Sequence, residues 1–383
     1  MSRAALARAL RAGLVLLAAA SLAGCAGWFG RPRRAVTLAE LPAVQGGVTV
    51  RPAWSVPVGR AGVGLAPTLV GDSVWAASYD GTVVRVDAAS GRVAWRTGIG
   101  RPIVAGVGSD GDTAVVVTRD GEVVALDAAG QVRWRSRIGT DVTTVPAVAL
   151  GLVLLRGADN RVVALDLADG QRRWQAQRPN PALVLRQTGG IAVSPEAAYV
   201  GMPGGRLAAF ALASGAPRWE VAVSLPRGAS EIERIADVVG SPLVSGREVC
   251  AVTYQGRIGC FDAASGSQVW VRDFSSASGL EVDARFVFAA DADSVVQAFS
   301  RTGASVWKQE RLVNRALTAP VSVGNAVVLG DRLGIVHFLS RETGAPMARA
   351  AAEGGAVIAP AVTADPIVVV QTAGGSLAAF RAE

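Results

Sequence analysis

The sequence DGTVVRVDAASGRVAW, from Asp80 to Trp95, recurs along the chain at a nearly constant interval. Asp120–Trp134 reads DGEVVALDAAGQVRW, and Asp159–Trp174 reads DNRVVALDLADGQRRW. Five related stretches follow, the fourth without the tryptophan and the fifth shorter than the others: Gly204–Trp219, Gln255–Trp270, Asp293–Trp307, Leu333–Ala348 and Gly374–Glu383. The sequence therefore contains eight copies of one unit, which indicates a repeat architecture.

Three columns of the aligned copies are apolar or small. The first holds a large apolar residue in every copy: Val83, Val123, Val162, Leu207, Ile258, Val296, Val336 and Leu377. The last does so too: Val86, Leu126, Leu165, Phe210, Phe261, Phe299, Leu339 and Phe380. Directly before it lies a mostly small column: Ala125, Ala164, Ala209, Cys260, Ala298 and Ala379. Adjacent apolar positions predict strands that are covered on both faces, and the Asp-Gly and Gly-Gly pairs beside them predict hairpin turns.

The length of the repeat and its strand content together predict the fold. Each unit has room for four short antiparallel strands, and the pattern lacks the 3.6-residue period of helices. Trp54 to Trp307 covers 253 residues in six steps, about 42 residues per step, which is the length of a propeller blade. Eight such units need about 336 residues, and residues 51–383 supply 333. We therefore predict an all-β, eight-bladed β-propeller of four-stranded antiparallel blades over residues 51–383.

The two ends of the repeat region complement each other. The last copy stops at Phe380–Glu383, before the position of its outer strand, whereas RPAWSVPVG from Arg51 onward is a strand with Trp54 and no unit before it. We expect this N-terminal strand to complete the last blade, because closing the ring removes the open edges of an unclosed array.

The net charge gives no sign of a nucleic-acid partner. The formal charge is +7, and it becomes +4, with 35 bases against 31 acids, once Arg3, Arg8 and Arg11 of the N-terminal segment are left out. The remaining arginines are scattered among acids and form no basic stripe, so they are expected on a solvated surface.

The N-terminal residues resemble a bacterial lipoprotein signal. A basic leader precedes the apolar stretch LVLLAAASLA, Leu14–Ala23, which is too short to span a bilayer. LAGC, Leu22–Cys25, then resembles the lipobox, and an ordinary signal peptide is the alternative. The resemblance implies a signal peptide over residues 1–24, lipidation of Cys25 and a flexible tether over residues 25–50. In such lipoproteins Ala26, in place of Asp, implies the outer membrane.

The two remaining cysteines, Cys250 and Cys260, flank the hairpin sequence AVTYQGRIG. A three-residue loop would place them directly opposite each other, and a two-residue loop would place them on opposite faces. A disulfide is compatible with the periplasm. Cys260 also falls in the column of small residues, so a buried free thiol is the other alternative.

The repeats are similar to those of quinoprotein alcohol dehydrogenases, which carry a Gly-x-x-x-Trp motif. The resemblance implies that one tryptophan per unit docks between adjacent blades: Trp54, Trp95, Trp134, Trp174, Trp219, Trp270 and Trp307. Such enzymes hold pyrroloquinoline quinone over calcium, which makes a quinoprotein dehydrogenase or sensor one functional hypothesis. This chain has no adjacent cysteines, no long inserted loops and no carboxylate cluster outside the turn columns, which argues against that hypothesis.

His337 is the only histidine. With one histidine, most acid–base catalytic sites and most histidine-containing metal sites are excluded. It lies in a variable strand column, so we expect a structural role. Ser90 and Ser265 precede glycines in turns and have no histidine partner, which disfavours nucleophilic hydrolysis. We predict no catalytic residue, no metal site and no cofactor.

The combination of lipobox, tether and one uninterrupted eight-bladed ring resembles the BamB family, the lipoprotein subunits of the outer-membrane β-barrel assembly (BAM) machinery. The repeat is interrupted in two places, because Trp174 to Trp219 spans 45 residues and Trp219 to Trp270 spans 51. Most other steps span 37 to 40 residues. Extra residues in a propeller lie in loops, where binding sites are common.

The two longer segments are similar to family segments that face the third periplasmic repeat domain of BamA. NPALVLRQTGG, residues 180–190, resembles the family's LxLR stretch, and residues 224–242 contain a stretch like its EIDRLSDVD. The resemblance implies that a set of seven residues binds BamA: Leu183, Leu185, Arg186, Glu231, Ile232, Arg234 and Asp237. Two positions depart from the family pattern, with Glu233 in place of Asp and Val239 in place of the second acid, and the latter puts an ionic contact there in doubt.

Leucines beside charged residues have the composition of an interface hot spot even without the resemblance. The alternative is that Leu183 and Leu185 begin an inward-facing strand and that Glu231, Glu233 and Arg234 form a solvated turn. The sequence thus predicts a non-enzymatic lipoprotein of the outer membrane that faces the periplasm. Its predicted partners are BamA, the rest of the BAM complex and unfolded β-barrel clients. A scaffold of another envelope complex is a further alternative.

Overall fold

The computed structural model describes residues 38, 40–41, 43–44, 46–62, 64–179, 183–185, 189–230 and 232–383. Cys25, Arg186 and Glu231 lie outside the described residues, as does the predicted signal peptide over residues 1–24. Within the described part of the chain, no helix is long and apolar enough to cross a membrane.

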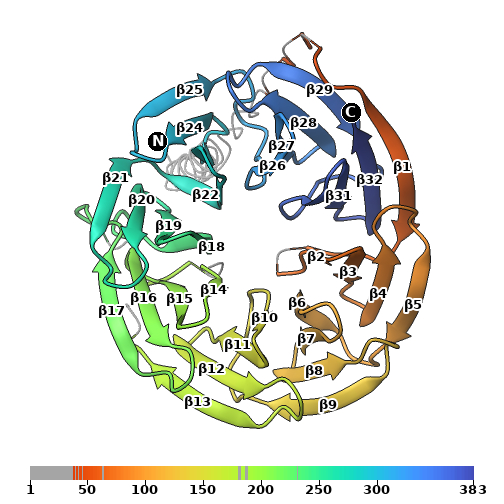
Figure 1. Ribbon diagram of the computed structural model, residues 1–383, viewed down its shortest axis with the longest axis vertical. Helices are drawn as coiled ribbons and strands as arrows, with labels where there is room; N and C mark the ends of the chain where they lie inside the picture. The colour runs from red at the N-terminus through yellow and green to blue at the C-terminus, as the bar shows by residue number, and fades with distance from the viewer. Residues whose placement is uncertain are drawn as a thin grey trace, which may run out of the picture. The chain divides into compact units, whose positions relative to one another are not determined.

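The described strands form eight separate four-stranded antiparallel sheets arranged as a ring (Figure 1). Blade 1 contains β2 (Thr68–Val70), β3 (Ser73–Ala77), β4 (Thr82–Asp87) and β5 (Val93–Gly98). Blade 2 contains β6 (Ile103–Ser109), β7 (Ala114–Thr118), β8 (Glu122–Leu126) and β9 (Val132–Arg137). Blade 3 contains β10 (Ala147–Ala149), β11 (Leu152–Arg156), β12 (Arg161–Asp166) and β13 (Arg172–Gln177). Blade 4 contains β14 (Ile191–Val193), β15 (Ala197–Met202), β16 (Arg206–Ala211) and β17 (Pro217–Ala222).

The second half of the ring repeats this order, with each blade running from the centre of the ring to its rim (Figure 1). Blade 5 contains β18 (Val238–Ser245), β19 (Glu248–Thr253), β20 (Arg257–Asp262) and β21 (Gln268–Asp273). Blade 6 contains β22 (Ser276–Val282), β23 (Phe286–Asp291), β24 (Val296–Ser300) and β25 (Ser305–Gln309). Blade 7 contains β26 (Val321–Val323), β27 (Ala326–Gly330), β28 (Ile335–Ser340) and β29 (Pro346–Ala351). Blade 8 contains β30 (Val362–Ala364), β31 (Ile367–Gln371), β32 (Ser376–Ala382) and β1 (Val50–Pro57).

Blade 8 is shared between the two ends of the repeat region. β1 pairs antiparallel with β32, and Trp54 lies opposite Ala379 in that register. Beyond the strand, the Thr49 N–H donates to the Glu383 carbonyl at 2.6 Å, and the Glu383 N–H donates to the Thr49 carbonyl at 3.0 Å. The predicted fold, including closure of the last blade by the N-terminal strand, is confirmed.

The adjacent apolar columns of the repeat are explained by cores on both faces of each blade. Along β8, Val123 and Ala125 belong to the core shared with blade 3, whereas Val124 and Leu126 belong to the core shared with blade 1. All four residues are fully buried. Because successive strand residues point to opposite faces, a strand between two cores must be apolar at every position.

Adjacent blades are joined by a contact between a tryptophan and a glycine. The indole ring of each outer-strand tryptophan lies against a glycine in a turn of the next blade, and a Cβ on that glycine would lie 2.4–2.8 Å from the ring. These glycines also have positive φ: Gly91, Gly130, Gly170, Gly215, Gly266, Gly303 and Gly344. Both the missing Cβ and the positive φ require glycine here. We call each such contact a joint.

The indole N–H of six of these tryptophans donates to a backbone carbonyl of the next blade. The pairs are Trp54–Ala88, Trp95–Ala128, Trp134–Leu167, Trp174–Leu212, Trp219–Ala263 and Trp307–Arg341, with N···O distances of 2.7–3.1 Å. Trp270 is different, because its buried indole N–H has no hydrogen-bond partner among the described residues. Blade 8 and blades 1 to 6 thus each supply a tryptophan to the joint that follows, and blades 1 to 7 each supply a glycine to the joint that precedes.

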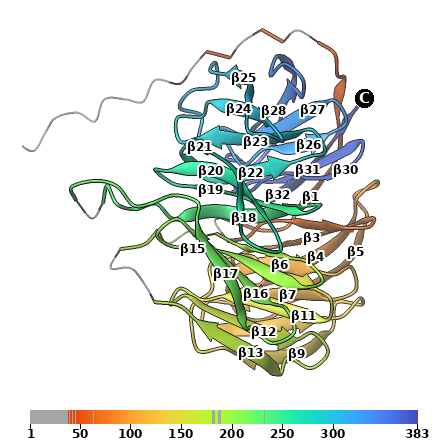
Figure 2. The same ribbon diagram turned by 60° about the vertical axis from the view of Figure 1, so that its left-hand side comes forward.

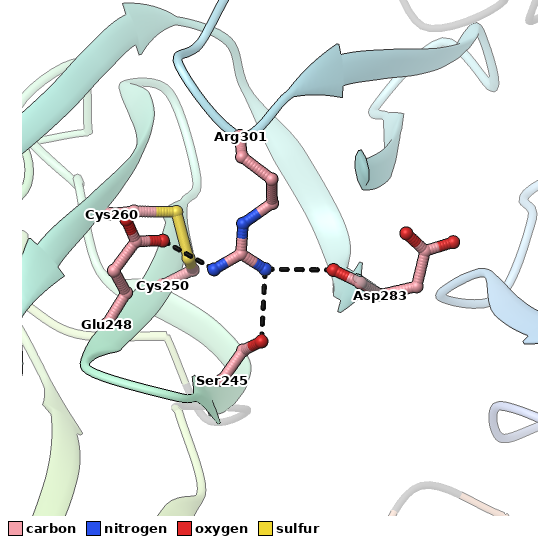
Figure 3. The surroundings of a disulfide bond; sticks show 6 residues. All are labelled: Ser245, Glu248, Cys250, Cys260, Asp283 and Arg301. Atoms are coloured by element: carbon pink, nitrogen blue, oxygen red, sulfur yellow. Dashed lines mark hydrogen bonds and ion pairs between the residues drawn. A yellow bond between two sulfur atoms is a disulfide. The ribbon is translucent and has the colours of Figure 1, made fainter. Parts of the chain in front are cut away.

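The two cysteines of blade 5 form a disulfide (Figure 3). Cys250 on β19 lies directly opposite Cys260 on β20. The loop between these strands has three residues, 254–256, and the Arg257 N–H closes it by donating to Thr253 Oγ1 at 2.7 Å. Of the arrangements that the sequence leaves open, the three-residue loop with facing cysteines is the one present.

Candidate protein-interaction site

Two connections between blades are longer than the others. The first connection, residues 178–190, joins β13 to β14, and the second connection, residues 223–237, joins β17 to β18. Figure 2 shows the described parts of both connections projecting from the same side of the ring. These are the two interruptions of the repeat in the sequence.

Asp237 ties the two connections together. It ends the second connection, and its carboxylate accepts the Leu185 N–H of the first connection at 2.6 Å. The other carboxylate oxygen accepts the Gly204 N–H of blade 4 at 2.8 Å. Asp237 is only 1% exposed. Its side chain therefore serves contacts within the chain and does not lie on the surface, in contrast to the role in partner contact that the sequence suggests.

The two leucines of the first connection face different environments. Leu183 is 43% exposed. Leu185 is half-buried and packs against the blade 5 core, which contains Val239 and the disulfide cysteines. The sequence allowed both leucines to lie either at an interface or facing inward. The structure has one of each, since Leu183 faces solvent and Leu185 faces inward.

The second connection adds two exposed apolar side chains. Ile232 is 67% exposed and Leu225 is 57% exposed. Leu225 is absent from the residues that the sequence singles out, although a leucine beside Pro226 in a long loop was a usable signal. Single exposed apolar side chains are normal on a protein surface, whereas apolar side chains that gather into one patch mark interaction surfaces.

A compact turn supports Ile232 at the tip of the second connection. The Glu233 carboxylate accepts the N–H groups of Ala229 at 2.7 Å and Ser230 at 3.2 Å. In return, Ser230 Oγ accepts the Glu233 N–H at 3.3 Å, so the two residues satisfy each other as in a capping box. The backbone N–H groups of Ser230 and Ala229 lower the pKa of Glu233.

Arg234 belongs to the same turn, and its Nε donates to the Gly228 carbonyl at 3.0 Å. Its side chain is exposed, so a guanidinium lies on the same turn as Ile232. Val239, which replaces the second acid of the family pattern, is 5% exposed and packs in the blade 5 core. The structure thus places an apolar residue at a position where a carboxylate would be buried.

His337 lies away from both connections. It is 3% exposed, and its Nε2 lies 3.0 Å from Asp331 Oδ2, which also accepts a hydrogen bond from Arg315 at 2.8 Å. Burial would raise the pKa of Asp331, but the hydrogen bonds from His337, the Ile335 N–H, Arg315 and the Leu333 N–H together outweigh it and lower the pKa to about 2. His337 is therefore part of a buried polar cluster of blade 7.

Among the described residues, one group has the spacing of metal ligands: Glu248, Cys250 and Cys260. The two cysteines are joined in the disulfide, so neither offers a thiolate. Glu248 pairs with Arg301 of blade 6, which also donates to Ser245 and to the Asp283 carbonyl (Figure 3). The group therefore forms a link between blades 5 and 6.

Comparison with known proteins relates the chain to one family of outer membrane protein assembly factors. A family model described as outer membrane protein assembly factor BamB matches residues 79–309 and 292–383. The outer membrane protein assembly factor BamB of Bordetella pertussis is 45% identical over 378 residues, which cover 98% of each chain. The crystal structure of BamB from Moraxella catarrhalis has a TM-score of 0.79 at 28% identity, covering 87% of this chain and all of that one.

The chain is also similar to a europium-containing methanol dehydrogenase, with a TM-score of 0.67 at 14% identity over 87% of this chain and 93% of that one. At this level of identity the likeness extends to the propeller fold alone. A superfold such as the propeller hosts unrelated functions, so a shared fold carries no activity with it.

Proposed function

Because this chain belongs to the BamB family of outer membrane protein assembly factors, we propose that it is a non-enzymatic scaffold that binds BamA and assists insertion of β-barrel proteins into the outer membrane. In this proposal Cys25 carries the lipid anchor, and the propeller faces the periplasm, where it meets the rest of the BAM complex and unfolded β-barrel clients. The ring gives rigidity, and the two connections provide the contact with BamA.

The observation that supports this assignment most directly is the hydrogen bond between Leu185 and Asp237. It brings together the only two segments that the sequence relates to BamA binding, although they are separated by a complete blade in the chain. The exposed side chains of Leu183, Leu225 and Ile232 then supply the apolar part of the contact, and Arg234 supplies a charged neighbour. A few buried apolar anchors surrounded by polar residues carry most of the energy of such interfaces.

The test compares two surface variants in a mild-detergent pull-down of the lipidated chain from native envelopes. In the first variant, Leu183→Asp and Ile232→Asp are combined. In the control variant, Val306→Asp alters an equally exposed apolar side chain on β25, at the rim of blade 6. Partners are identified by mass spectrometry, and circular dichroism confirms that both variants are folded.

We expect BamA to accompany the wild type and the Val306→Asp control. The Leu183→Asp, Ile232→Asp variant should bind BamA about 1,000-fold more weakly, since two hot-spot side chains that each contribute about 2 kcal/mol together contribute about 4 kcal/mol. Retention of BamA by the folded double variant would remove these connections from the interface. Absence of BamA from the wild-type sample would contradict the proposed function itself.

A further inference from the structure

We propose that Arg156, with Asn160 and Asp237, is a positioning residue of this site. The three buried side chains hold Pro179, Leu185 and Gly189 of the first connection in the arrangement that BamA binds, without contacting BamA. The inference rests on the proposed function. It assigns binding affinity to a residue of blade 3 that lies outside both connections.

Arg156 and Asn160 hold the two ends of the first connection. Arg156 is the last residue of β11 and is 3% exposed. One of its terminal nitrogens donates to the Gly189 carbonyl at 3.2 Å, and the other donates to Asn160 Oδ1 at 2.7 Å. Asn160 in turn donates from Nδ2 to the Pro179 carbonyl at 3.2 Å. Pro179 and Gly189 lie near opposite ends of the connection, so one pair of side chains fixes both.

Asp237 holds the same connection between those ends, through the Leu185 N–H. Burial lowers the pKa of Arg156 to about 10, and the negative charge of Asp237 opposes this decrease. Arg156 is therefore charged at neutral pH, and Asp237 is the carboxylate that compensates its buried charge. Removing either side chain would leave the other charge poorly compensated.

The anchor point at Gly189 is closely packed, with no room for a side chain. A Cβ at Gly189 would lie 2.8 Å from the Gly201 Cα of blade 4 and 3.1 Å from the Gly240 carbonyl of blade 5. The next residue, Gly190, donates its N–H to that same carbonyl at 2.9 Å. The carbonyl that Arg156 binds thus belongs to backbone packed against two blades, which makes it a fixed point for the connection.

Arg156 and Asn160 both depart from the repeat. The residue that pairs with the first apolar column is small or apolar in six blades: Ala77, Val117, Gly201, Val252, Ala290 and Gly330. Blade 3 has Arg156 there, and blade 8 has Gln371. The Asn160 position, with φ of 62°, is glycine in most other copies. The ring forms without these side chains elsewhere, so their presence in blade 3 is not a requirement of the fold.

Arg156 also carries a cost for the ring. Its Nε is buried and has no hydrogen-bond partner among the described residues, and burying a charged group with unmet hydrogen bonds is unfavourable. Arg156 departs from the repeat at this cost and lies beside one of the two longest connections. Its hydrogen bond to that connection explains why it is there.

The experiment returns these positions to the residues of the other blades. Arg156→Val and Asn160→Gly place the repeat's own residues in blade 3, so the variants are expected to fold. The control is Gln371→Val, which removes a buried polar side chain from the same column of blade 8, where it donates to the Ala77 carbonyl at 2.9 Å. For each full-length lipidated chain, three quantities are measured: the thermal midpoint, the hydrogen exchange of the Leu185 amide, and the rates of binding to purified BamA.

In Arg156→Val and Asn160→Gly, we expect the Leu185 amide to exchange at least about tenfold faster, because its hydrogen bond opens when the connection is released. Affinity for BamA should fall about tenfold, mainly through slower association, because only a fraction of the molecules is competent to bind. Gln371→Val should leave the exchange of Leu185 and the affinity unchanged. Arg156→Val should also lower the thermal midpoint, because the buried Asp237 loses its compensating charge. A purely structural role would lower the midpoint without speeding the exchange of the Leu185 amide or weakening binding to BamA.

Wild-type exchange at Leu185 in Arg156→Val would overturn the proposal. Faster exchange with unchanged affinity would overturn it too, since the connection would then be held for another reason. If the wild type does not bind BamA, the proposed function fails, and the exchange of Leu185 still decides whether Arg156 holds the connection.

Discussion

The joints between blades and the two long connections are held in different ways. A joint is one contact repeated around the ring, such as Trp174 against Gly215, and each copy resembles the next. The connections have no repeated contact, and the first connection depends on single groups such as Asp237 and Arg156. The difference teaches that stability is distributed over the ring, whereas the described residues of the first connection are held by a few buried polar side chains.

Substitutions in the two regions should therefore differ in their effect on the free energy of unfolding. A substitution in a joint should lower the free energy of unfolding, because it disturbs the packing between two blades. A substitution on the exposed part of a connection should leave that free energy almost unchanged, since surface changes away from special features are within about 0.5 kcal/mol. The following variants test how sharply the two regions differ.

The largest effect on stability is expected from Gly215→Ala in the joint with Trp174. The new Cβ would lie 2.4 Å from the indole ring, and the residue has a φ of 70°. Displacing the ring and straining the backbone together should lower the free energy of unfolding by about 3 kcal/mol, measured by urea denaturation.

Gly246→Ala is the matched control, because Gly246 has a φ of 61° and nothing within 4 Å of an added Cβ. It should lose only about 1 kcal/mol, from the backbone alone. Equal losses in the two variants would mean that the tryptophan–glycine contact adds no stability of its own.

An effect of opposite sign, and at most about as large, is expected at the boundary of blades 6 and 7. Burial raises the pKa of Glu281 on β22 to about 7, and the neighbouring Asp283 raises it further, against the Ser322 N–H, which lowers it. The folded chain therefore keeps a proton that the unfolded chain loses near pH 4.5, and stability falls as the pH rises from about 4.5 to about 7. Glu281→Gln should remove this decline and gain up to about 3 kcal/mol above pH 7.

Urea denaturation from pH 4.5 to pH 8 measures this effect. The wild type and Glu281→Gln should be similar at the lowest pH and should diverge toward pH 7. Parallel curves over the whole range would show that the Glu281 carboxyl titrates alike in the folded and unfolded states. The ionised Glu281 side chain would then cost the ring no stability above pH 7.

The ring was predictable because the residues that build it recur at a regular interval in the sequence. The tryptophan column, the glycine four residues before it and the unpaired strand around Trp54 recur or complement one another in the sequence, so the blade number and the closure follow from counting. The disulfide was not predictable to the same degree. Its geometry depends on whether the hairpin loop has two or three residues, and turn residues such as Gln255 and Gly256 allow either.

The site was only partly predictable, since its segments break the period. The longer steps identified both connections, but spacing gives no burial, and therefore Asp237 and Leu185 were expected at the surface with Leu183 and Ile232. Arg156 reads as the end of the apolar strand LVLLR. Its role depends on the Gly189 carbonyl, which lies far along the chain, and only the structure brings the two together.

The most direct test of BamA binding by the connections is site-specific photocrosslinking in living cells. A photoreactive amino acid replaces Ile232 at the tip of the second connection or, as control, Leu150, which is 61% exposed in the hairpin between β10 and β11. The account predicts a crosslink to BamA from position 232 and none from position 150. A BamA crosslink from position 150 with none from position 232 would place the interface on another face of the ring and contradict the account.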